Sequence, residues 1–356
     1  MFLVVDTISG GVVSYTFLQI VRSSSKKPYT SLPSSLILGF LGVSLYYAIV
    51  NHVMVTVYGK DAVNGFNEIV KIERQLVATT LEEAGTTRPV IDDSHAKLAS
   101  ILTMIVQSFS AYRYIIAPSQ FFMQFDAYYF TLRDLNDIFK FSQSTMLVFN
   151  LARLGILTIT VFEIFRLLCL VILIFISALN MVRSIFAVLL HVSGQRFTSL
   201  ARINAGITTQ FKMQLAMKAL APFQELGTFF LILIGLVIFV VSNFVTIKLY
   251  DSLPFPVYAF FSSVSVVVAL VINLTLPLAH GLLDSSTEIK RRLGASLMGE
   301  GNKRQIQCGR RRLNGMQLFC VWAGFGGNRM FRLNKETKVQ YFEQVISATV
   351  NILLGN

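Results

Sequence analysis

Apolar residues gather along the chain in seven stretches that are long enough to cross a lipid bilayer. A helix needs about 20 such residues to span a hydrocarbon core of about 30 Å, and polar segments separate one stretch from the next. We therefore predict an all-α protein built as a bundle of seven transmembrane helices. The predicted spans are residues 2–21, 35–58, 98–122, 146–179, 228–250, 256–282 and 337–354.

The helical pattern continues from several of these spans into the polar connections. Apolar residues recur at helical spacing after the second span, at Phe66, Ile69 and Val70. They recur in the same way before the fifth span, at Leu200 and Ile203. The fourth stretch is also longer than a bilayer requires. We therefore expect several helices to extend out of the membrane into the cytoplasm.

Positive charge concentrates in the connection before the last span. Residues 283–336 carry 11 of the 31 Lys and Arg residues of the chain, and an excess of Lys and Arg marks the cytoplasmic loops of membrane proteins. With seven spans, this places the N-terminus in the cytoplasm and the C-terminus outside, and we expect the plasma membrane as the location. The net charge of +12 then reflects topology and contact with membrane lipid, so we expect no binding to nucleic acid.

Composition agrees with a membrane protein and gives no sign of an enzyme. Apolar residues make up 54% of the chain, against about 45–50% in an average soluble domain, and the mean hydropathy is +0.61. The four His residues are scattered, and the sequence contains no zinc-binding, nucleotide-binding or nucleophile motif. We expect no catalytic residues, no cofactor and no bound metal.

Four charged residues fall within or at the ends of predicted spans: Arg113, Arg153, Glu163 and Arg166. An unpaired charge near the centre of a span costs about 2.5–3.5 kcal/mol on insertion scales, so each of these residues needs a partner. Glu163 and Arg166 are three residues apart on one helix, and we predict that they pair with each other.

The last span carries a stripe of small and polar residues. Gln344, Ala348, Asn351 and Gly355 recur at spacings of four, three and four, which places them on one helical face. Amides that faced lipid would lack partners, so this face should contact other helices or water. Two interpretations follow: helix packing through small residues, or the lining of a pore.

Aromatic residues crowd the end of the third span. Tyr112 and Tyr114 lie there, and Tyr46, Tyr47 and His52 lie opposite them in the second span. A belt of aromatic residues at the membrane interface has this composition. The wall of a ligand cavity has it too, because apolar rings provide contact area and a few hydroxyls fix the orientation of the ligand.

The end of the chain also carries a recognisable pattern. Residues 331–334 read Phe-Arg-Leu-Asn, a short gap follows, and residues 348–356 read Ala-Thr-Val-Asn-Ile-Leu-Leu-Gly-Asn. This resembles the C-terminal signature of the insect-type seven-transmembrane chemoreceptor superfamily of gustatory and odorant receptors, whose members typically end in Thr-Tyr, five apolar residues and Gln-Phe. Here Asn351 lies among the five apolar positions and would supply the amide of the pore in place of the terminal Gln.

The resemblance implies a ligand-gated, nonselective cation channel that detects a small-molecule tastant or odorant. Its subunits would form a homo- or heterotetramer in which the terminal helix lines the pore. The ligand would bind in the outer half of the first six spans, which favours the cavity interpretation of the aromatic residues. The chain would divide into a ligand-binding bundle (1–282), a cytoplasmic anchor (283–336) and a terminal pore helix (337–356).

Two other classes of membrane protein are alternatives. A G-protein-coupled receptor would have the opposite orientation and an Asp-Arg-Tyr step after the third span, which this sequence lacks. A transporter would show repeat symmetry and broken helices near the middle of the membrane, and the sequence shows neither. The channel is therefore the preferred prediction.

Overall fold

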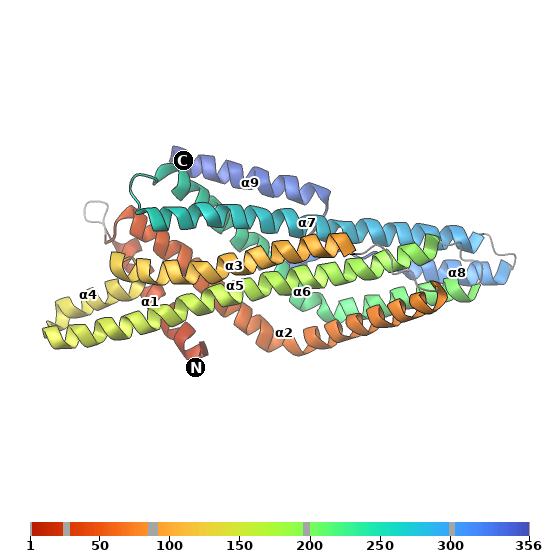
Figure 1. Cartoon of the computed structure of the whole chain (residues 1–356), viewed down its shortest axis with the longest axis horizontal. Helices are drawn as coiled ribbons and strands as arrows, with labels where there is room; N and C mark the ends of the chain where they lie inside the picture. The colour runs from red at the N-terminus through yellow and green to blue at the C-terminus, as the bar shows by residue number, and fades with distance from the viewer. Residues whose placement is uncertain (1, 24–28, 85–91, 195–199, 299–302, 356) are drawn as a thin grey trace.

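Four helices of the chain are far longer than a bilayer crossing requires. They contain 53, 52, 49 and 44 residues, which corresponds to lengths of roughly 66–80 Å at about 1.5 Å per residue. In the computed structural model they lie side by side and give the molecule an elongated shape (Figure 1). The structure describes all residues except 1, 24–28, 85–91, 195–199, 299–302 and 356.

The described residues form helices and one small hairpin of strands. In chain order the elements are α1 (Phe2–Arg22), α2 (Leu32–Ala84), α3 (Asp92–Met123), α4 (Ala127–Phe139), α5 (Gln143–Gly194), α6 (Leu200–Lys248), α7 (Phe255–Met298), α8 (Lys303–Gly315), β1 (Trp322–Phe325), β2 (Asn328–Arg332) and α9 (Lys335–Leu354). The helix α4 marks one end of the bundle and α8 the other (Figure 1). We refer to these as the α4 end and the α8 end.

The predicted spans fall within helices, except for the last two residues of the span 228–250, which lie beyond the end of α6 at Lys248. They lie in α1, α2, α3, α5, α6, α7 and α9, and the predicted extensions of the second, fourth and fifth spans are confirmed by α2, α5 and α6. By length and composition, α2, α5, α6 and α7 can each cross a membrane. The short helix α4, between the third and fourth spans, was not predicted. The predicted domain boundary at residue 282 falls inside α7, which continues to Met298 without a break.

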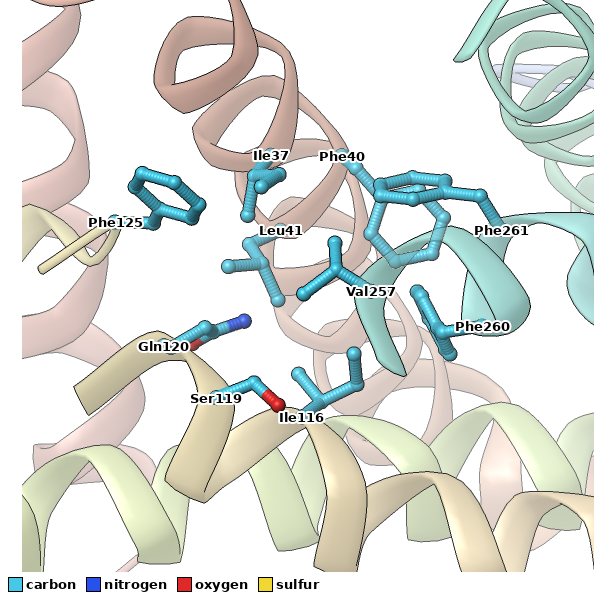
Figure 2. A pocket seen from close by; sticks show the side chains of 10 residues that line it. All are labelled: Ile37, Phe40, Leu41, Ile116, Ser119, Gln120, Phe125, Val257, Phe260 and Phe261. Atoms are coloured by element: carbon cyan, nitrogen blue, oxygen red, sulfur yellow. The ribbon is translucent and has the colours of Figure 1, made fainter. Parts of the chain in front are cut away.

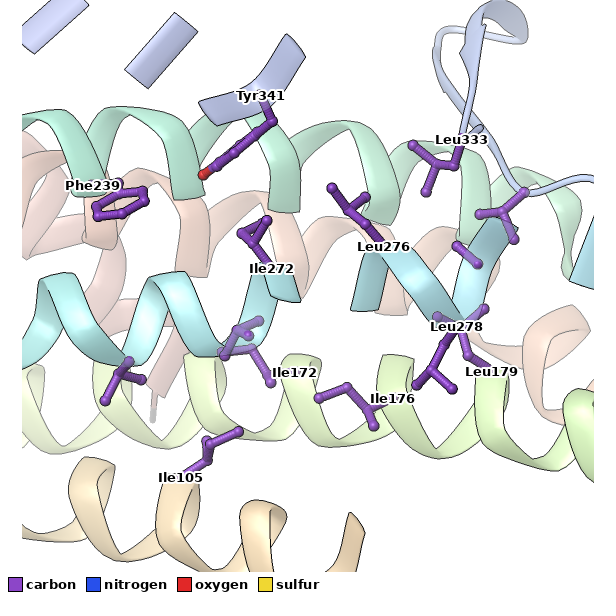
Figure 3. Packing of buried hydrophobic residues seen from close by; sticks show 14 of the residues in the cluster. Ile105, Ile172, Ile176, Leu179, Phe239, Ile272, Leu276, Leu278, Leu333 and Tyr341 are labelled. Atoms are coloured by element: carbon purple, nitrogen blue, oxygen red, sulfur yellow. The ribbon is translucent and has the colours of Figure 1, made fainter. Parts of the chain in front are cut away.

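The bundle is held together by a continuous apolar core. Figure 3 shows side chains from successive layers meeting along it: Ile105 of α3, Ile172 of α5, Ile272 of α7 and Phe239 of α6. The last layer is α9, which packs against α6 and α7 along the half of the bundle nearer the α4 end (Figure 1). It contributes Tyr341 to the same core.

A β-hairpin connects α8 to α9. Its strands pair antiparallel, and its turn contains Gly326 and Gly327, both with positive φ, a conformation that glycine adopts without strain. After the hairpin, the Asn334 side chain accepts a hydrogen bond from the Thr337 backbone N–H, which satisfies a free amide at the start of α9.

Candidate ligand cavity and terminal helix

An apolar cavity lies inside the bundle, between five helices. Its volume is about 70 Å³. Side chains from α2, α3, α5, α6 and α7 line it: Phe40, Tyr47, Phe109, Tyr112, Phe165, Leu168, Ile172, Leu231, Ile234, Gly235, Ile238, Val264, Val267, Val268, Val271 and Ile272. The wall is therefore built of hydrocarbon and aromatic rings, with two tyrosines as its polar members.

A cluster of aromatic rings forms one side of this cavity. The Tyr112 ring lies 5.1 Å from that of Phe260, in an edge-to-face arrangement, and 6.0 Å from that of Phe165. Phe40 contacts Phe260 and Phe261, also edge to face, at 5.6 and 5.5 Å. Such pairs contribute about 0.5–1.5 kcal/mol each beyond the area they bury. The rings therefore support one another and make this side of the cavity rigid.

Tyr47 lines the cavity, and its hydroxyl is buried with no hydrogen-bond partner within the described residues. The side chain is 1% exposed. A buried polar group without a partner costs about 1–3 kcal/mol, which a ligand with a hydrogen-bonding group would recover. Tyr47 therefore combines a position in the cavity wall with a buried hydroxyl that has no partner among the described residues.

The structure brings together two of the five residues predicted to bind the ligand, Tyr47 and Tyr112. The other three do not line this cavity. Tyr46 is adjacent to Tyr47 on the helix and therefore points about 100° away, where its hydroxyl bonds to Ser14. Tyr114 is exposed and stacks edge to face on Phe162, and His52 is half-buried one turn beyond the cavity-lining part of α2. For these three positions, ligand binding stays a prediction.

Sequence reasoning missed the phenylalanines of the wall: Phe40, Phe109 and Phe165. Each lies in a different helix, among other aromatic residues, and their meeting depends on how the helices rotate and pack. The composition of the spans signals that aromatic residues are plentiful. It does not say which of them face inward.

A second and smaller cavity lies between the first part of α2, the last part of α3 and the first part of α7, and Figure 2 shows the side chains that line it. Its volume is about 10 Å³, and Phe40 lines both cavities. Gln120 reaches into it from α3, and the amide oxygen of this residue is buried without a hydrogen-bond partner among the described residues. A space of this size holds about one water molecule or one hydroxyl group.

Buried charges near the α4 end are fully paired. Arg153 of α5 donates to both carboxylate oxygens of Asp126, the closest contact being 2.5 Å, and to the backbone carbonyl of Phe121 at 3.1 Å. Asp126 also accepts from the Tyr129 N–H and so caps α4. The cluster ties the start of α4 to α5. Further along α5, the predicted pair of Glu163 and Arg166 is confirmed at 2.6 Å.

The terminal helix α9 has two distinct faces. Tyr341, Val345 and Thr349 are buried against the bundle, whereas Gln344 and Asn351 are exposed. Of the other predicted pore-lining residues, Gly355 is exposed and Ala348 is half-buried against the core. The exposed polar face continues beyond the predicted stripe through three further residues: Gln340, Glu343 and Ser347.

Cations cover the α8 end. Arg310, Arg311 and Arg312 of α8 are exposed. On neighbouring α7, Glu288 accepts hydrogen bonds from Arg291 and from Arg292, each at 2.7 Å. These hydrogen bonds, that of Arg291 first, lower the pKa of the Glu288 carboxyl to about 2. The carboxylate therefore stays ionised throughout the physiological pH range.

Solved structures of one receptor resemble this chain over almost its whole length. The insect olfactory receptor OR5 from Machilis hrabei aligns with 99% of this chain and 87% of its own, with a TM-score of 0.69 and 10% sequence identity. The fold is that of an insect olfactory receptor. The same receptor in complex with eugenol aligns with 99% of this chain and 88% of its own, with a TM-score of 0.57 and 12% identity.

The olfactory-receptor fold confirms the predicted helical membrane bundle, and with the long apolar helices it makes this chain a multi-pass membrane protein. The number of membrane crossings and the side of the N-terminus stay predictions. No protein-family model matches the sequence, and no curated protein matches it either.

Proposed function

We propose that this protein is a chemosensory receptor, a subunit of a ligand-gated, nonselective cation channel of the gustatory and odorant receptor type. The observation that carries this is the position of α9. One face of this helix packs on α6 and α7, which also line the apolar cavity, and another face exposes Gln344 and Asn351. A single helix thus connects the helices that line the cavity to a wettable surface.

The exposed polar face of α9 requires other subunits to enclose a path for ions. One helix cannot surround a pore, and we propose a homo- or heterotetramer in which four copies of α9 do so. Exposed apolar residues on the flank of α9, Val339, Ile346 and Val350, would then contact a neighbouring subunit or lipid. The amides of Gln344 and Asn351 and the hydroxyl of Ser347 would keep the path wet.

The cavity favours a small, mainly apolar ligand with one hydrogen-bonding group. The aromatic wall provides the apolar contacts, and the Tyr47 hydroxyl provides the polar one. Its volume of about 70 Å³ is about half that of an engineered cavity of about 150 Å³ that binds benzene. A ligand with an aromatic ring must therefore expand the cavity as it enters. Eugenol, which OR5 binds, is a small phenol of this class and a suitable first probe.

We place the α8 end in the cytoplasm of a cell whose plasma membrane the protein crosses. Exposed arginines on α8 support this orientation. It puts the N-terminus inside, the end of α9 outside, and residues 283–336 in a cytoplasmic anchor through which subunits meet. The aromatic cavity then lies in the outer half of residues 1–282, and residues 337–356 form the pore helix.

Expression in cells with calcium imaging tests this proposal. We expect calcium entry within seconds of adding an agonist from a panel of phenols, alcohols and tastants, and we expect it to persist when G-protein signalling is blocked. A tag after residue 356 should be accessible to antibody in intact cells. An inaccessible C-terminal tag together with a response abolished by G-protein inhibitors would overturn the proposal in favour of a G-protein-coupled receptor.

A further inference from the structure

The side chain of Tyr341 of α9 approaches the wall of the apolar cavity from outside the cavity. Its side chain is 4% exposed, and its hydroxyl has no hydrogen-bond partner within the described residues. Figure 3 shows the ring directed from α9 toward α6 and α7. A Cβ atom added to Gly235 of α6 would lie 3.2 Å from the Tyr341 hydroxyl oxygen. Gly235 also lines the cavity, so it lies between the cavity and the Tyr341 hydroxyl.

The wall of the cavity is thinnest at this contact. Every other α6 residue that lines the cavity, Leu231, Ile234 and Ile238, carries a branched side chain, whereas Gly235 offers only backbone. One layer of main-chain atoms therefore separates the space for a ligand from the pore helix. Because Gly235 carries no Cβ, it leaves a gap that a single methyl group would nearly fill, with that carbon 3.2 Å from the Tyr341 hydroxyl oxygen. A wall displaced far enough to close this gap pushes on Tyr341.

Expansion of the cavity should occur preferentially on this side. A ligand larger than about 70 Å³ must displace part of the wall. The side formed by Tyr112, Phe165 and Phe260 is a cluster of interlocking rings. On the Gly235 side, the group behind the wall is a hydroxyl with no hydrogen bond to lose. Displacement therefore costs least toward α9.

The way α9 is held allows such a displacement. Just before the helix, Leu333 is 2% exposed and donates its backbone N–H to the Val321 carbonyl at 2.9 Å, so the first turn is fixed to the hairpin. Further along, the buried Thr349 hydroxyl has no partner among the described residues, and the buried face depends on apolar contacts. A push at Tyr341 thus acts beyond the fixed end and tilts the remainder of α9.

From this geometry we propose that Gly235 and Tyr341 form the contact through which occupancy of the cavity moves the pore helix. The inference rests on the proposed channel function and names the residues that regulate it. Tyr341 is a positioning residue here, since it acts through the cavity wall. The glycine is required because a side chain at residue 235 would hold Tyr341 in the displaced position with no ligand bound.

A set of three variants tests this contact by current measurement. Gly235→Ala places a methyl group against the Tyr341 hydroxyl, so we expect current without ligand to rise at least fivefold per channel at the cell surface. Tyr341→Phe removes the hydroxyl, and in the double variant it should bring that current back to within twofold of wild type. Tyr341→Phe alone should raise the half-maximal ligand concentration about fivefold, because the wall then moves further before it reaches α9.

Gly227→Ala is the matched control, since the same substitution in the same helix would place its Cβ at an ordinary 3.7 Å from Met54. A ligand-free current that rises equally in Gly227→Ala and Gly235→Ala would overturn the inference, as would a Gly235→Ala current that Tyr341→Phe fails to lower.

Hydrogen exchange of the purified protein separates this inference from the proposed function. Gly235→Ala should speed exchange of the backbone amides of residues 341–354 at least threefold relative to Gly227→Ala, and Tyr341→Phe should reverse the effect. This difference in exchange would support the contact even if the wild-type protein carried no current. Absence of current would overturn the proposed channel function but not the contact between Gly235 and Tyr341. Equal exchange in the two alanine variants would reject the contact whatever the currents show.

Discussion

Two sets of buried polar groups in this bundle differ in how they are satisfied. Near the α4 end, Arg153 and Asp126 bond to each other and to neighbouring groups. Around the cavity, the hydroxyls of Tyr47 and Tyr341 are buried with no partner among the described residues. The first set stabilises the fold. The second set costs stability, and we infer that it is kept for a ligand and for the movement of α9.

This difference predicts that loss of Arg153 has the largest effect on stability. Arg153→Ala leaves Asp126 buried without a cation, and removing one partner of a buried ion pair costs about 3–5 kcal/mol. We expect a large drop in the thermal unfolding temperature of the purified protein. Arg133→Ala is the control, because Arg133 pairs with Asp134 at the surface of α4, where a pair is worth about 0–1 kcal/mol. Equal losses for the two variants would contradict the distinction.

Tyr112→Ala should have the next largest effect, because it removes a ring from the aromatic cluster. Truncating a buried aromatic residue costs about 3–5 kcal/mol, and the lost wall should raise the half-maximal ligand concentration more than tenfold per receptor at the surface. Tyr114→Ala, two residues along the same helix, removes an exposed ring and should leave both quantities nearly unchanged. If both variants respond to ligand like wild type, Tyr112 does not form the ligand site.

Tyr47→Phe should separate stability from ligand response. Removing an unpartnered hydroxyl should leave stability unchanged or raise it by about 1 kcal/mol. The same change should weaken the response to a phenol about five- to tenfold, since a hydrogen bond contributes about 0.5–1.5 kcal/mol. The response to the hydrocarbon with the same ring should not change. If the responses to the phenol and to the hydrocarbon weaken equally, Tyr47 contributes to the shape of the cavity and does not form a hydrogen bond with the ligand.

Asn351→Leu should have the smallest effect on stability, because the side chain is exposed. We expect this substitution to change conduction instead. An apolar ring in the pore dries the path, so we expect a lower single-channel current. Asn351→Asp should shift the reversal potential toward that of calcium. Ile352→Asp, one residue off the polar face, is the comparison: if it shifts selectivity in the same way, Asn351 does not line the pore.

The extent of the helices could be predicted from the sequence, since burial in lipid and protein requires long apolar runs with a helical period. The periodicity after the second span and before the fifth span indicated that helices continue beyond the spans, as α2 and α6 do. The helix α4 was not predicted because it contains only 13 residues and its N-cap is Asp126. The role of Asp126 depends on Arg153, which lies 27 residues later in the sequence.

The candidate site could be predicted only in part. Aromatic content indicated Tyr47 and Tyr112, but the choice between Tyr46 and Tyr47 depends on how α2 rotates in the bundle, and no local pattern gives that rotation. Gly235 gave no signal at all, because a glycine within an apolar span reads as a tolerated small residue. The role that we propose for Gly235 depends on its proximity to Tyr341, which lies more than 100 residues later in the chain.

The unbroken length of α5 has a mechanical consequence. The helix contains 52 residues without an internal proline, so it acts as a stiff lever that passes from the α4 end to the α8 end. A tilt of about 2° over roughly 78 Å moves the far tip by about 3 Å, given a rise of about 1.5 Å per residue. Small displacements at one end of the helix are thereby magnified into larger displacements at the opposite end.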